Sequence, residues 1–177
     1  RIHKIKGLGV IQSNISINDI DIFVFDFDGV LTDNFVHIDQ DGRESVVCSR
    51  SDGLGIDALR KIKSIYILSS EKNSVVTSRA NKLQIKVKHG VSNKVSALNE
   101  LLEKESLALD RVFYVGNDLN DLEVMNECKY SACPSDSHHR IKDVATYVLK
   151  TKGGKGVVRE ILEDIFKLDL MKILYNK

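Results

Sequence analysis

Short apolar runs alternate with amphipathic helical patterns along most of the chain. Three continuous runs, at residues 22–25, 65–68 and 112–115, are typical of strands buried on both faces. Weaker strand patterns lie at residues 85–87, 130–133 and 146–149, and apolar residues recur with helical spacing over 75–83, 95–102 and 157–165. Strands and helices that alternate in this way predict βαβ units, and therefore a Rossmann-like α/β fold with a parallel sheet and helices on both faces.

One segment interrupts this alternation directly after the first strand. Residues 35–38 and 44–47 have short strand patterns around Asp41-Gly42, and Asp-Gly between such runs predicts a β-hairpin. The hairpin would lie at the carboxyl end of the sheet, where ligands bind in open α/β folds. Its position is equally compatible with a flap over a site and with a plain surface hairpin.

Composition and charge exclude several classes of protein. The chain has 26 Lys and Arg residues against 25 Asp and Glu residues, a formal net charge of +1. A protein that binds nucleic acid through phosphate contacts usually has a basic excess, so this balance argues against one. The longest apolar runs are too short to span a membrane, no apolar signal region opens the chain, and the 3 cysteines show no CxxC spacing. We therefore expect a cytoplasmic protein without membrane contact, disulfide framework or zinc site.

The 177 residues have the length of one domain. Residues 1–20 carry Gly, Asn and charge with little periodicity, so we expect an N-terminal arm or linker there and a single domain over residues 21–177. The first residue is Arg1 rather than Met, from which we expect a fragment or a processed chain.

The strongest chemical signal is Asp26-Phe27-Asp28-Gly29, directly after the first buried run. Two carboxylates this close at a strand end both reach the carboxyl-end crevice, where they repel each other unless a cation lies between them. A hard cation such as Mg²⁺ takes oxygen ligands and keeps several waters, so it fits this pair. Asp26 could then act as a nucleophile and Asp28 as a proton donor. Such a pair alone is also common in turns, and we expect the nearby Asp33 to be an ordinary turn residue.

Three later segments end at the same edge of the predicted sheet. Ser69 and Ser70 follow the second buried run, Lys94 opens a helical pattern, and Asn117 follows the third buried run. A hydroxyl, an amine and amide or acidic oxygens there could bind a phosphate group and a metal ion. Each has a plain alternative when it is taken alone: a helix N-cap, a solvated lysine and an Asx turn. Four signals of the right type in this order make coincidence a poor explanation.

Together these residues resemble the four motifs of the haloacid dehalogenase-like (HAD) phosphatase superfamily, over about residues 21–166. The resemblance implies that Asp26 is a nucleophile that forms an aspartyl-phosphate and that Asp28 is the general acid–base. It also implies that Ser69 hydrogen-bonds the transferring phosphoryl group and that Lys94 stabilises its charge. The reaction would be the hydrolysis of a phosphomonoester.

The same resemblance implies a Mg²⁺ cofactor held by the Asp26 carboxylate, the Asp28 backbone carbonyl and Asn117. The family normally has Asp at this last position, where this chain has Asn117. A carbonyl oxygen of Asn can still bind Mg²⁺ but brings no charge. We therefore expect weaker metal binding unless Asp118 or Asp121 compensates through ordered waters.

No cap domain fits between the motifs. One hairpin and one helix fill residues 33–69, and one helix and one strand fill residues 69–94. With the segments at residues 51–56 and 153–160, this arrangement resembles the capless branch that contains the 3-deoxy-octulosonate 8-phosphate phosphatases, whose subunits form tetramers in which a neighbour closes each site. The branch also supplies a C-terminal domain of acylneuraminate cytidylyltransferases. We therefore expect a homotetramer and, with residues 1–20 as a linker, a fused or partner cytidylyltransferase domain.

The choice of sugar rests on the second motif. Octulosonate phosphatases usually follow the motif serine with Gly-Arg, whereas this chain has Ser70-Glu71-Lys72, which resembles the members that act on nine-carbon sugar acids. Arg79 and Lys82 share a helix face and match basic positions that face the sugar acid in those members, although both could lie on a solvated face. The resemblance thus implies that Ser70, Glu71, Arg79 and Lys82 bind a nonulosonate such as an acylneuraminate 9-phosphate, a sialic acid precursor. A 3-deoxy-octulosonate 8-phosphate phosphatase and a non-catalytic tetramerisation domain are the alternatives.

The glycine-rich residues 153–156 have two interpretations. The amphipathic pattern that follows them favours a loop that starts a helix. The family resemblance favours a lip that contacts substrate.

Overall fold

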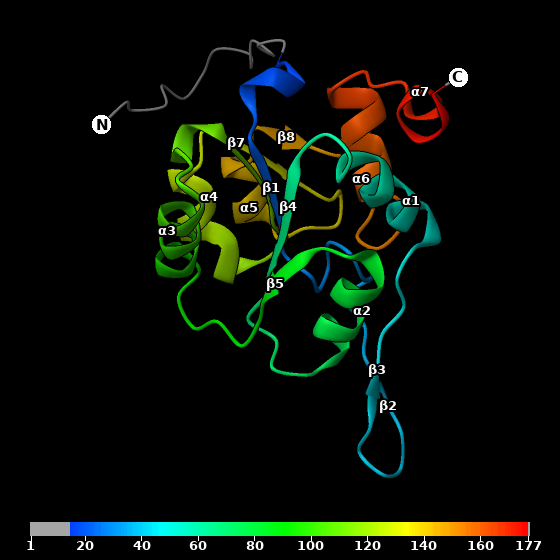
Figure 1. Cartoon of the computed structure of the whole chain (residues 1–177). Helices are drawn as coiled ribbons and strands as arrows, with labels where there is room; N and C mark the ends of the chain where they lie inside the picture. Colours follow the sequence, from blue (N-terminus) through cyan, green and yellow to red (C-terminus); the bar gives the residue numbers. More distant parts are fainter. Residues whose placement is uncertain (1–14, 177) are drawn as a thin grey trace.

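The computed structural model describes residues 15–176. Its centre is a sheet in which six parallel strands follow the order β5-β4-β1-β6-β7-β8 (Figure 1). The strands are β1 (Ile22–Phe25), β4 (Ser64–Leu68), β5 (Lys86–Lys88), β6 (Val112–Val115), β7 (Tyr130–Cys133) and β8 (Tyr147–Val148). Every strand predicted for this sheet forms, with its ends no more than one residue from the predicted ones. The predicted Rossmann-like parallel sheet is therefore confirmed.

Helices cover both faces of this sheet, as predicted. The helices are α1 (Arg50–Leu59), α2 (Val75–Leu83), α3 (Lys94–Glu105), α4 (Leu122–Glu127), α5 (His139–Val144), α6 (Val157–Glu160) and α7 (Leu170–Tyr175). A π-helical turn, η4 (Ile161–Ile165), continues α6, and short 3₁₀ turns lie at η1 (Ile17–Asp19), η2 (Leu109–Arg111) and η3 (Leu119–Asp121). The first face carries α1, α2, α6 and α7, and the opposite face carries α3, α4 and α5. The described residues form no cap domain over the sheet.

Alternate residues of β1 enter different parts of the core. Phe23 and Phe25 belong to a cluster under the first face, and Ile22 and Val24 belong to a cluster under the second. Because helices cover both faces, each position of this strand is apolar. This is the physical reason why a continuous apolar run, rather than an alternating one, predicts the strand.

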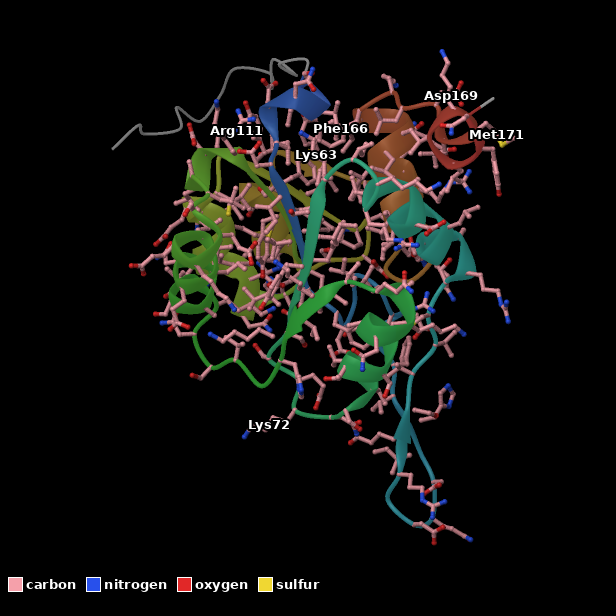
Figure 2. All side chains as sticks on the ribbon, viewed as in Figure 1. Lys63, Lys72, Arg111, Phe166, Asp169 and Met171 are labelled. Atoms are coloured by element: carbon pink, nitrogen blue, oxygen red, sulfur yellow. The ribbon has the colours of Figure 1, made fainter. Side chains whose placement is uncertain are left out.

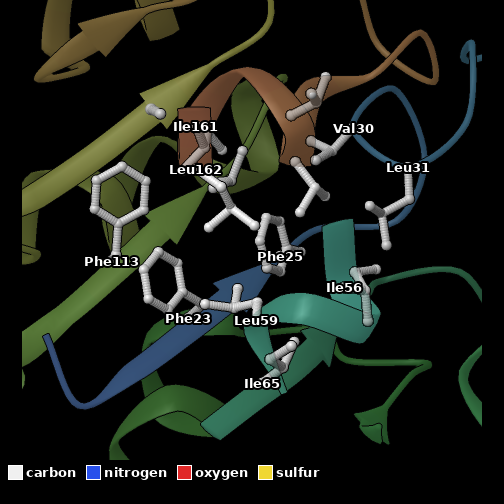
Figure 3. Close-up of a cluster of buried hydrophobic side chains, with 14 of the residues drawn as sticks. Phe23, Phe25, Val30, Leu31, Ile56, Leu59, Ile65, Phe113, Ile161 and Leu162 are labelled. Atoms are coloured by element: carbon white, nitrogen blue, oxygen red, sulfur yellow. The ribbon is translucent and has the colours of Figure 1, made fainter. Parts of the chain in front are cut away.

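The first cluster also anchors the loop that leaves β1. The ring centroids of Phe23 and Phe113 lie 5.3 Å apart, and Phe166 meets both rings edge-on. Figure 3 shows Val30 and Leu31 from this loop pointing into the same cluster. Apolar burial therefore holds the loop after β1 against the sheet, which fixes the residues that precede Val30.

The predicted hairpin is present and stands off the domain. Its strands are β2 (His37–Ile38) and β3 (Glu44–Ser45), which pair antiparallel. The hairpin projects from the body at the end of the molecule opposite to α7 (Figure 1). Its apolar side chains are exposed, with Phe35 at 73 % and Ile38 at 65 %. Exposed apolar residues of this size on a projecting element are typical of a surface that contacts a partner.

The folded domain begins further upstream than the sequence predicts. Ile15 and Ile20, which we assigned to an arm or linker, are buried in the first cluster. Arg111 also pairs with Asp21, and Figure 2 shows Arg111 close to this N-terminal segment. Two isolated apolar residues carry too little periodicity to be recognised as core. Residues 1–14 of the predicted arm lie outside the described residues.

Two further expectations concern the membrane and the cysteines. Within residues 15–176, no helix is long and apolar enough to cross a membrane. All three cysteines, Cys48, Cys128 and Cys133, are free thiols, as their spacing predicts.

Candidate active site

A cavity opens where the strand order reverses. The chain goes from β1 to β4 on one side and later to β6 on the other, so the carboxyl end of β1 is the switch point at which α/β folds bind ligands. The cavity there has a volume of about 530 Å³. Its lining consists of Asp26, Asp28, Asn34, Ser69, Ser70, Glu71, Asn117, Asp118, Leu119 and Asn120. The first, second and last predicted motifs therefore meet in one place.

Lys94, from the third motif, reaches this cavity through Asp26. Lys94 Nζ lies 2.9 Å from Asp26 Oδ1 and 2.7 Å from Asp121 Oδ1, and none of the three side chains is more than 5 % exposed. Lys94 is the first residue of α3, which Asn93 caps by accepting from Ser96 N–H. The helix start thus fixes the backbone from which the lysine extends to the nucleophile candidate.

The two oxygens of Asp26 differ in their environment. Oδ1 accepts a hydrogen bond from Phe27 N–H at 2.8 Å and contacts Lys94. Within residues 15–176, the side-chain hydrogen bond and the ion pair of Asp26 both fall on Oδ1, and neither involves Oδ2. Because Asp26 lines the cavity, Oδ2 is the oxygen available to a ligand or an electrophile.

The buried charges at this point do not balance. Asp26 and Asp121 together carry two carboxylates against the single ammonium of Lys94. Burial, and then the charge of Asp121, raises the pKa of Asp26 well above its usual value, although Lys94 opposes this shift. Burial acts to lower the pKa of Lys94, but the two carboxylates outweigh it and the pKa is raised. A bound cation would offset the excess negative charge.

Asp28 lies half-buried in the cavity wall. Burial, followed by the negative charge of Glu71, raises the pKa of the Asp28 carboxyl, against an opposing hydrogen bond with Thr32. A carboxyl whose pKa is raised keeps its proton to higher pH, which suits a group that donates a proton.

The second motif forms a tight loop after β4. Ser69 is buried, and its Oγ accepts from Glu71 N–H at 3.1 Å. Asn120 Nδ2 donates to Ser70 Oγ at 3.3 Å, which joins the second motif to the last one across the cavity. Both hydroxyl groups therefore lie at the site that the sequence predicts for them.

Glu71 lies between two cavities. Its Oε1 accepts from Lys72 N–H at 2.6 Å and Asn73 N–H at 2.7 Å. It lines the main cavity and a neighbouring one of about 270 Å³, whose other walls are Asp28, Asn34, Phe35, Val36, Glu44, Val46 and Val75. Lys72 itself is exposed and points away from the body (Figure 2). The second cavity places the base of the hairpin beside the main site.

Asn117 has the properties of a neutral metal ligand. It is buried, and its Oδ1 has no hydrogen-bond partner among the described residues. A buried carbonyl oxygen without a partner is costly, so a ligand there would relieve the cost. Within residues 15–176 no group of three or more Asp, Glu, His or Cys side chains could hold a metal ion. A set that combines Asp26, the Asp28 carbonyl and Asn117 needs fewer such side chains and fits a hard cation such as Mg²⁺.

Two residues of the site have roles that the sequence does not predict. Asp121 binds Lys94, whereas its place in Gly116-Asn117-Asp118-Leu119-Asn120-Asp121 predicts a role in the metal site, either as one of its oxygens or through ordered waters. Tyr114 donates its hydroxyl to Asp121 Oδ1 at 2.8 Å. Burial, followed by the charge of Asp121, raises the pKa of Tyr114 well above its usual value, so it stays a neutral donor. No sequence signal separates Tyr114 from an ordinary strand residue.

Arg79 and Lys82 lie outside both cavities. Arg79 Nη2 donates to the carbonyl oxygen of Ser49 at 3.0 Å, and Lys82 is exposed on the same helix, α2. Their predicted role in substrate binding stays a prediction, and within a single copy of the chain they do not reach the site.

The glycine-rich residues 153–156 pack against the back of the loop after β1. Gly154 N–H donates to the Val30 carbonyl at 2.9 Å, and a Cβ added at Gly153 would stand 2.2 Å from the Gly29 carbonyl oxygen. None of these glycines lines the main cavity. The structure therefore favours the interpretation as a helix-start loop, whose glycines allow close backbone contact.

Two acidic residues near the site have structural partners instead. Asp33 Oδ2 lies 3.7 Å from Lys155 Nζ, as expected of a turn residue with a weak surface contact. Asp52, buried in α1, accepts from Gly156 N–H at 3.1 Å and Val158 N–H at 2.7 Å at the start of α6.

The fold and the site define a Rossmann-like α/β protein whose nucleophile candidate is an aspartate at the switch point of a parallel sheet. Residues 56–161 match the family model described as haloacid dehalogenase-like hydrolase. The chain belongs to this family and is a phosphatase. The fold, the family and the enzyme class that the sequence predicts are thus confirmed.

Individual relatives agree with this assignment. The chain is 35 % identical over 147 residues to the 3-deoxy-D-manno-octulosonate 8-phosphate phosphatase of Escherichia coli K12, covering 82 % of this chain and 78 % of that protein. A HAD family hydrolase from Streptomyces avermitilis has a similar structure, with a TM-score of 0.86, 43 % identity and coverage of 90 % and 92 %. The octulosonate phosphatase of Moraxella catarrhalis, solved with magnesium, phosphate and 3-deoxy-octulosonate, has a TM-score of 0.81, 30 % identity and coverage of 85 % and 88 %.

Proposed function

We propose that this phosphatase hydrolyses the phosphate ester of a sugar acid through an aspartyl-phosphate, with Mg²⁺ as its cofactor. The observation that carries the proposal is the placement of Asp26, with Oδ1 held by Lys94 and Phe27 N–H and Oδ2 open to the cavity. The octulosonate phosphatases among the relatives support the sugar-acid class. The presence of Asp26, Asp28 and Ser69 around one cavity supports catalysis over a purely structural tetramerisation domain.

In the first step, Asp26 Oδ2 attacks the phosphorus atom, and the bond between phosphorus and the sugar oxygen breaks. Asp28 gives its proton to the leaving oxygen, so the sugar acid departs as an alcohol and the phosphoryl group is bound to Asp26. The raised pKa of Asp28 supports this role because the carboxyl must be protonated at the start. Lys94 and the Ser69 hydroxyl hold the nucleophile and the phosphoryl group in place.

In the second step, Asp28 takes a proton from a water molecule whose oxygen attacks the phosphorus atom. The bond between Asp26 and phosphorus breaks, inorganic phosphate leaves, and Asp26 is again a carboxylate. Asp28 ends the cycle protonated, ready for the next substrate.

Asp26, the Asp28 carbonyl and Asn117 would hold Mg²⁺. When bound, the ion supplies positive charge that neutralises the phosphoryl oxygens. Two observations support a cation at this place: Asn117 Oδ1 has no hydrogen-bond partner in the described part of the chain, and the Asp26–Lys94–Asp121 cluster has excess negative charge.

Two sugar acids are candidates. The first is 3-deoxy-octulosonate 8-phosphate, because similar proteins are phosphatases of this compound. These relatives support it at least as well as they support a nine-carbon sugar acid. The position of Glu71 in both cavity walls supports a nonulosonate such as an acylneuraminate 9-phosphate, because a carboxylate there can accept hydrogen bonds from additional hydroxyl groups.

We further propose that the protein works as a homotetramer joined through its hairpins. Asp26, Asp28, Glu71 and Asp118 line the main cavity, whereas no lysine or arginine among residues 15–176 does. A phosphorylated sugar acid carries several negative charges, so a neighbouring subunit that adds cations would complete the site. Arg79 and Lys82 are the predicted candidates for such a contribution. A fused or partner cytidylyltransferase domain and a cytoplasmic location stay expectations from the sequence.

A phosphate-release assay with Mg²⁺ tests the proposal directly. The panel contains octulosonate 8-phosphate, acylneuraminate 9-phosphate and p-nitrophenyl phosphate. Asp26→Asn should abolish release on all three substrates while the unfolding temperature stays close to that of the wild type. Asp33→Asn, a nearby acidic residue outside the cavity, is the matched control and should keep full activity. Wild-type-like turnover of Asp26→Asn would remove Asp26 as the nucleophile.

The same panel separates the two sugar acids. Glu71→Ala should raise KM for the preferred sugar-acid phosphate by a factor that corresponds to roughly 1–3 kcal/mol, with a smaller effect on p-nitrophenyl phosphate. Arg79→Ala should behave likewise if a neighbour's arginine binds the sugar carboxylate. A wild-type preference for octulosonate 8-phosphate would exclude the nonulosonate assignment.

A further inference from the structure

Asp121 joins the nucleophile to the last motif through four donors. Its Oδ2 accepts from Asn117 N–H at 2.9 Å and from Asp118 N–H at 3.4 Å. Its Oδ1 lies 2.7 Å from Lys94 Nζ, and Lys94 in turn lies 2.9 Å from Asp26 Oδ1. The orientation of one buried carboxylate therefore bears on both the predicted metal ligand and the nucleophile.

Tyr114 supplies the remaining donor to this carboxylate. Its hydroxyl donates to Asp121 Oδ1 at 2.8 Å, so Tyr114 and Lys94 share one acceptor atom. Tyr114 is fully buried and lies on the central strand β6. A phenol fixed to a packed strand is a much more rigid donor than a lysine, whose long side chain has many rotamers.

The hydroxyl of Tyr114 is buried beside an apolar core. The Tyr114 ring belongs to the second core cluster, whose other buried members are apolar side chains and two cysteines. A hydroxyl buried in an apolar cluster costs free energy unless it is hydrogen-bonded. The hydrogen bond to Asp121 offsets this cost. It also connects Tyr114, a core residue, to the candidate active site.

We propose that Tyr114 is a positioning residue, which fixes Asp121 Oδ1 so that Lys94 is held against Asp26 Oδ1. The path runs from the strand through a neutral phenol, a carboxylate and an ammonium to the nucleophile. Without the hydroxyl, Asp121 keeps its two backbone donors on Oδ2. Its Oδ1 then keeps Lys94 as a donor but loses the rigid donor that fixes its position. Lys94 then samples other rotamers, and Asp26 spends less time in its reactive orientation. This inference rests on the proposed phosphatase mechanism.

Tyr114→Phe tests the inference because it removes the hydroxyl and keeps the ring. With p-nitrophenyl phosphate at saturating Mg²⁺, kcat should fall roughly tenfold, as expected for the loss of one hydrogen bond to a charged group. KM should change less than about threefold, because the effect falls on the orientation of the nucleophile rather than on uniform binding. Tyr66→Phe is the matched control, since Tyr66 packs against the same cluster from β4, whereas the hydroxyl that donates to Asp121 belongs to Tyr114. It should keep both constants.

A double-mutant cycle gives the second test. In an Asp121→Asn background, Tyr114→Phe should cost less than about threefold in kcat, because the acceptor through which Tyr114 acts has already been altered. Equal losses in both backgrounds, unchanged kcat in Tyr114→Phe, or an equal loss in Tyr66→Phe would each overturn the inference. Unfolding temperatures measured for each variant check that it is folded at the assay temperature. A wild-type chain that releases phosphate from no phosphomonoester would instead overturn the proposed function, together with this inference.

Discussion

The amide of Asn117 occupies the space of the side chain that Gly29 lacks. A Cβ atom added at Gly29 would stand 1.9 Å from Asn117 Nδ2 and 2.6 Å from its Cγ. Gly29 also has a φ of +74°, in the left-handed region that favours glycine. Through this contact, the loop that carries Asp26 and Asp28 and the loop that carries Asn117 are seated against each other.

Gly29→Ala should therefore damage the site more than the fold. The methyl group displaces Asn117, so the Mg²⁺ concentration needed for half-maximal activity should rise at least roughly tenfold. The left-handed φ should also cost on the order of 1–2 kcal/mol of stability. Metal titrations of phosphate release and thermal unfolding measure the two effects.

Gly42→Ala separates the cost of backbone strain from the cost of crowding. Gly42 has a φ of +75° at the hairpin tip, but a Cβ there meets nothing within 4 Å. The two variants share the backbone cost, so Gly42→Ala should lose stability without any change in the Mg²⁺ requirement. A Gly29→Ala enzyme with the wild-type requirement would show that Asn117 is not seated by this contact.

Asn117→Asp should lower the Mg²⁺ concentration that activity requires, by roughly tenfold. The reason is that an anionic oxygen replaces the neutral Oδ1, which has no hydrogen-bond partner within residues 15–176. Asn120→Asp adds the same charge at the cavity mouth, where the side chain bonds Ser70 instead, and should have a much smaller effect. Isothermal titration with Mg²⁺ provides a readout besides turnover. An unchanged affinity in Asn117→Asp would point to Asp118 as the ligand.

The exposed hairpin leads to a prediction about assembly. Phe35→Asp combined with Ile38→Asp should convert the predicted tetramer into smaller species, because both side chains are largely exposed in one copy and would be buried between copies. Light scattering measures the mass, and phosphate release should fall in parallel as the cavity loses its cover. Met171→Asp alters a residue that is 56 % exposed on α7, far from the hairpin, and should leave the mass unchanged (Figure 2). A wild-type protein that is an active monomer would contradict the prediction.

The sequence predicts most of the fold because its strands are buried on both faces. Residues 22–25 form one apolar run, and the strand end then places Asp26 and Asp28 at the switch point without further information. Lys94 is predictable for a similar reason, since it opens a helix after a loop.

Side-chain partners are harder to predict because they depend on rotamers and on distant segments. The contact between Lys94 and Asp121 joins residues 27 positions apart, and no periodicity encodes it. The hydrogen-bond partner of Arg79 is equally unpredictable. The spacing of Arg79 places it on the same helix face as Lys82, but the sequence does not reveal that the Arg79 guanidinium donates to the Ser49 carbonyl oxygen.

Glu71→Gln should move the alkaline limb of the pH–activity profile to lower pH. Burial and the charge of Glu71 raise the pKa of Asp28, so the neutral amide removes the second cause and lowers that pKa. Asp28 must be protonated to act on the leaving group, and a lower pKa means that this proton is lost at lower pH. Gln retains an acceptor for the backbone N–H groups of Lys72 and Asn73, so the loop should keep its conformation.

Glu44, a weaker contributor to the raised pKa of Asp28, provides a graded comparison. Glu44→Gln should shift the alkaline limb in the same direction by less. A profile measured on p-nitrophenyl phosphate at saturating Mg²⁺ decides the matter, and an unmoved alkaline limb in Glu71→Gln would mean that Asp28 is not the proton donor.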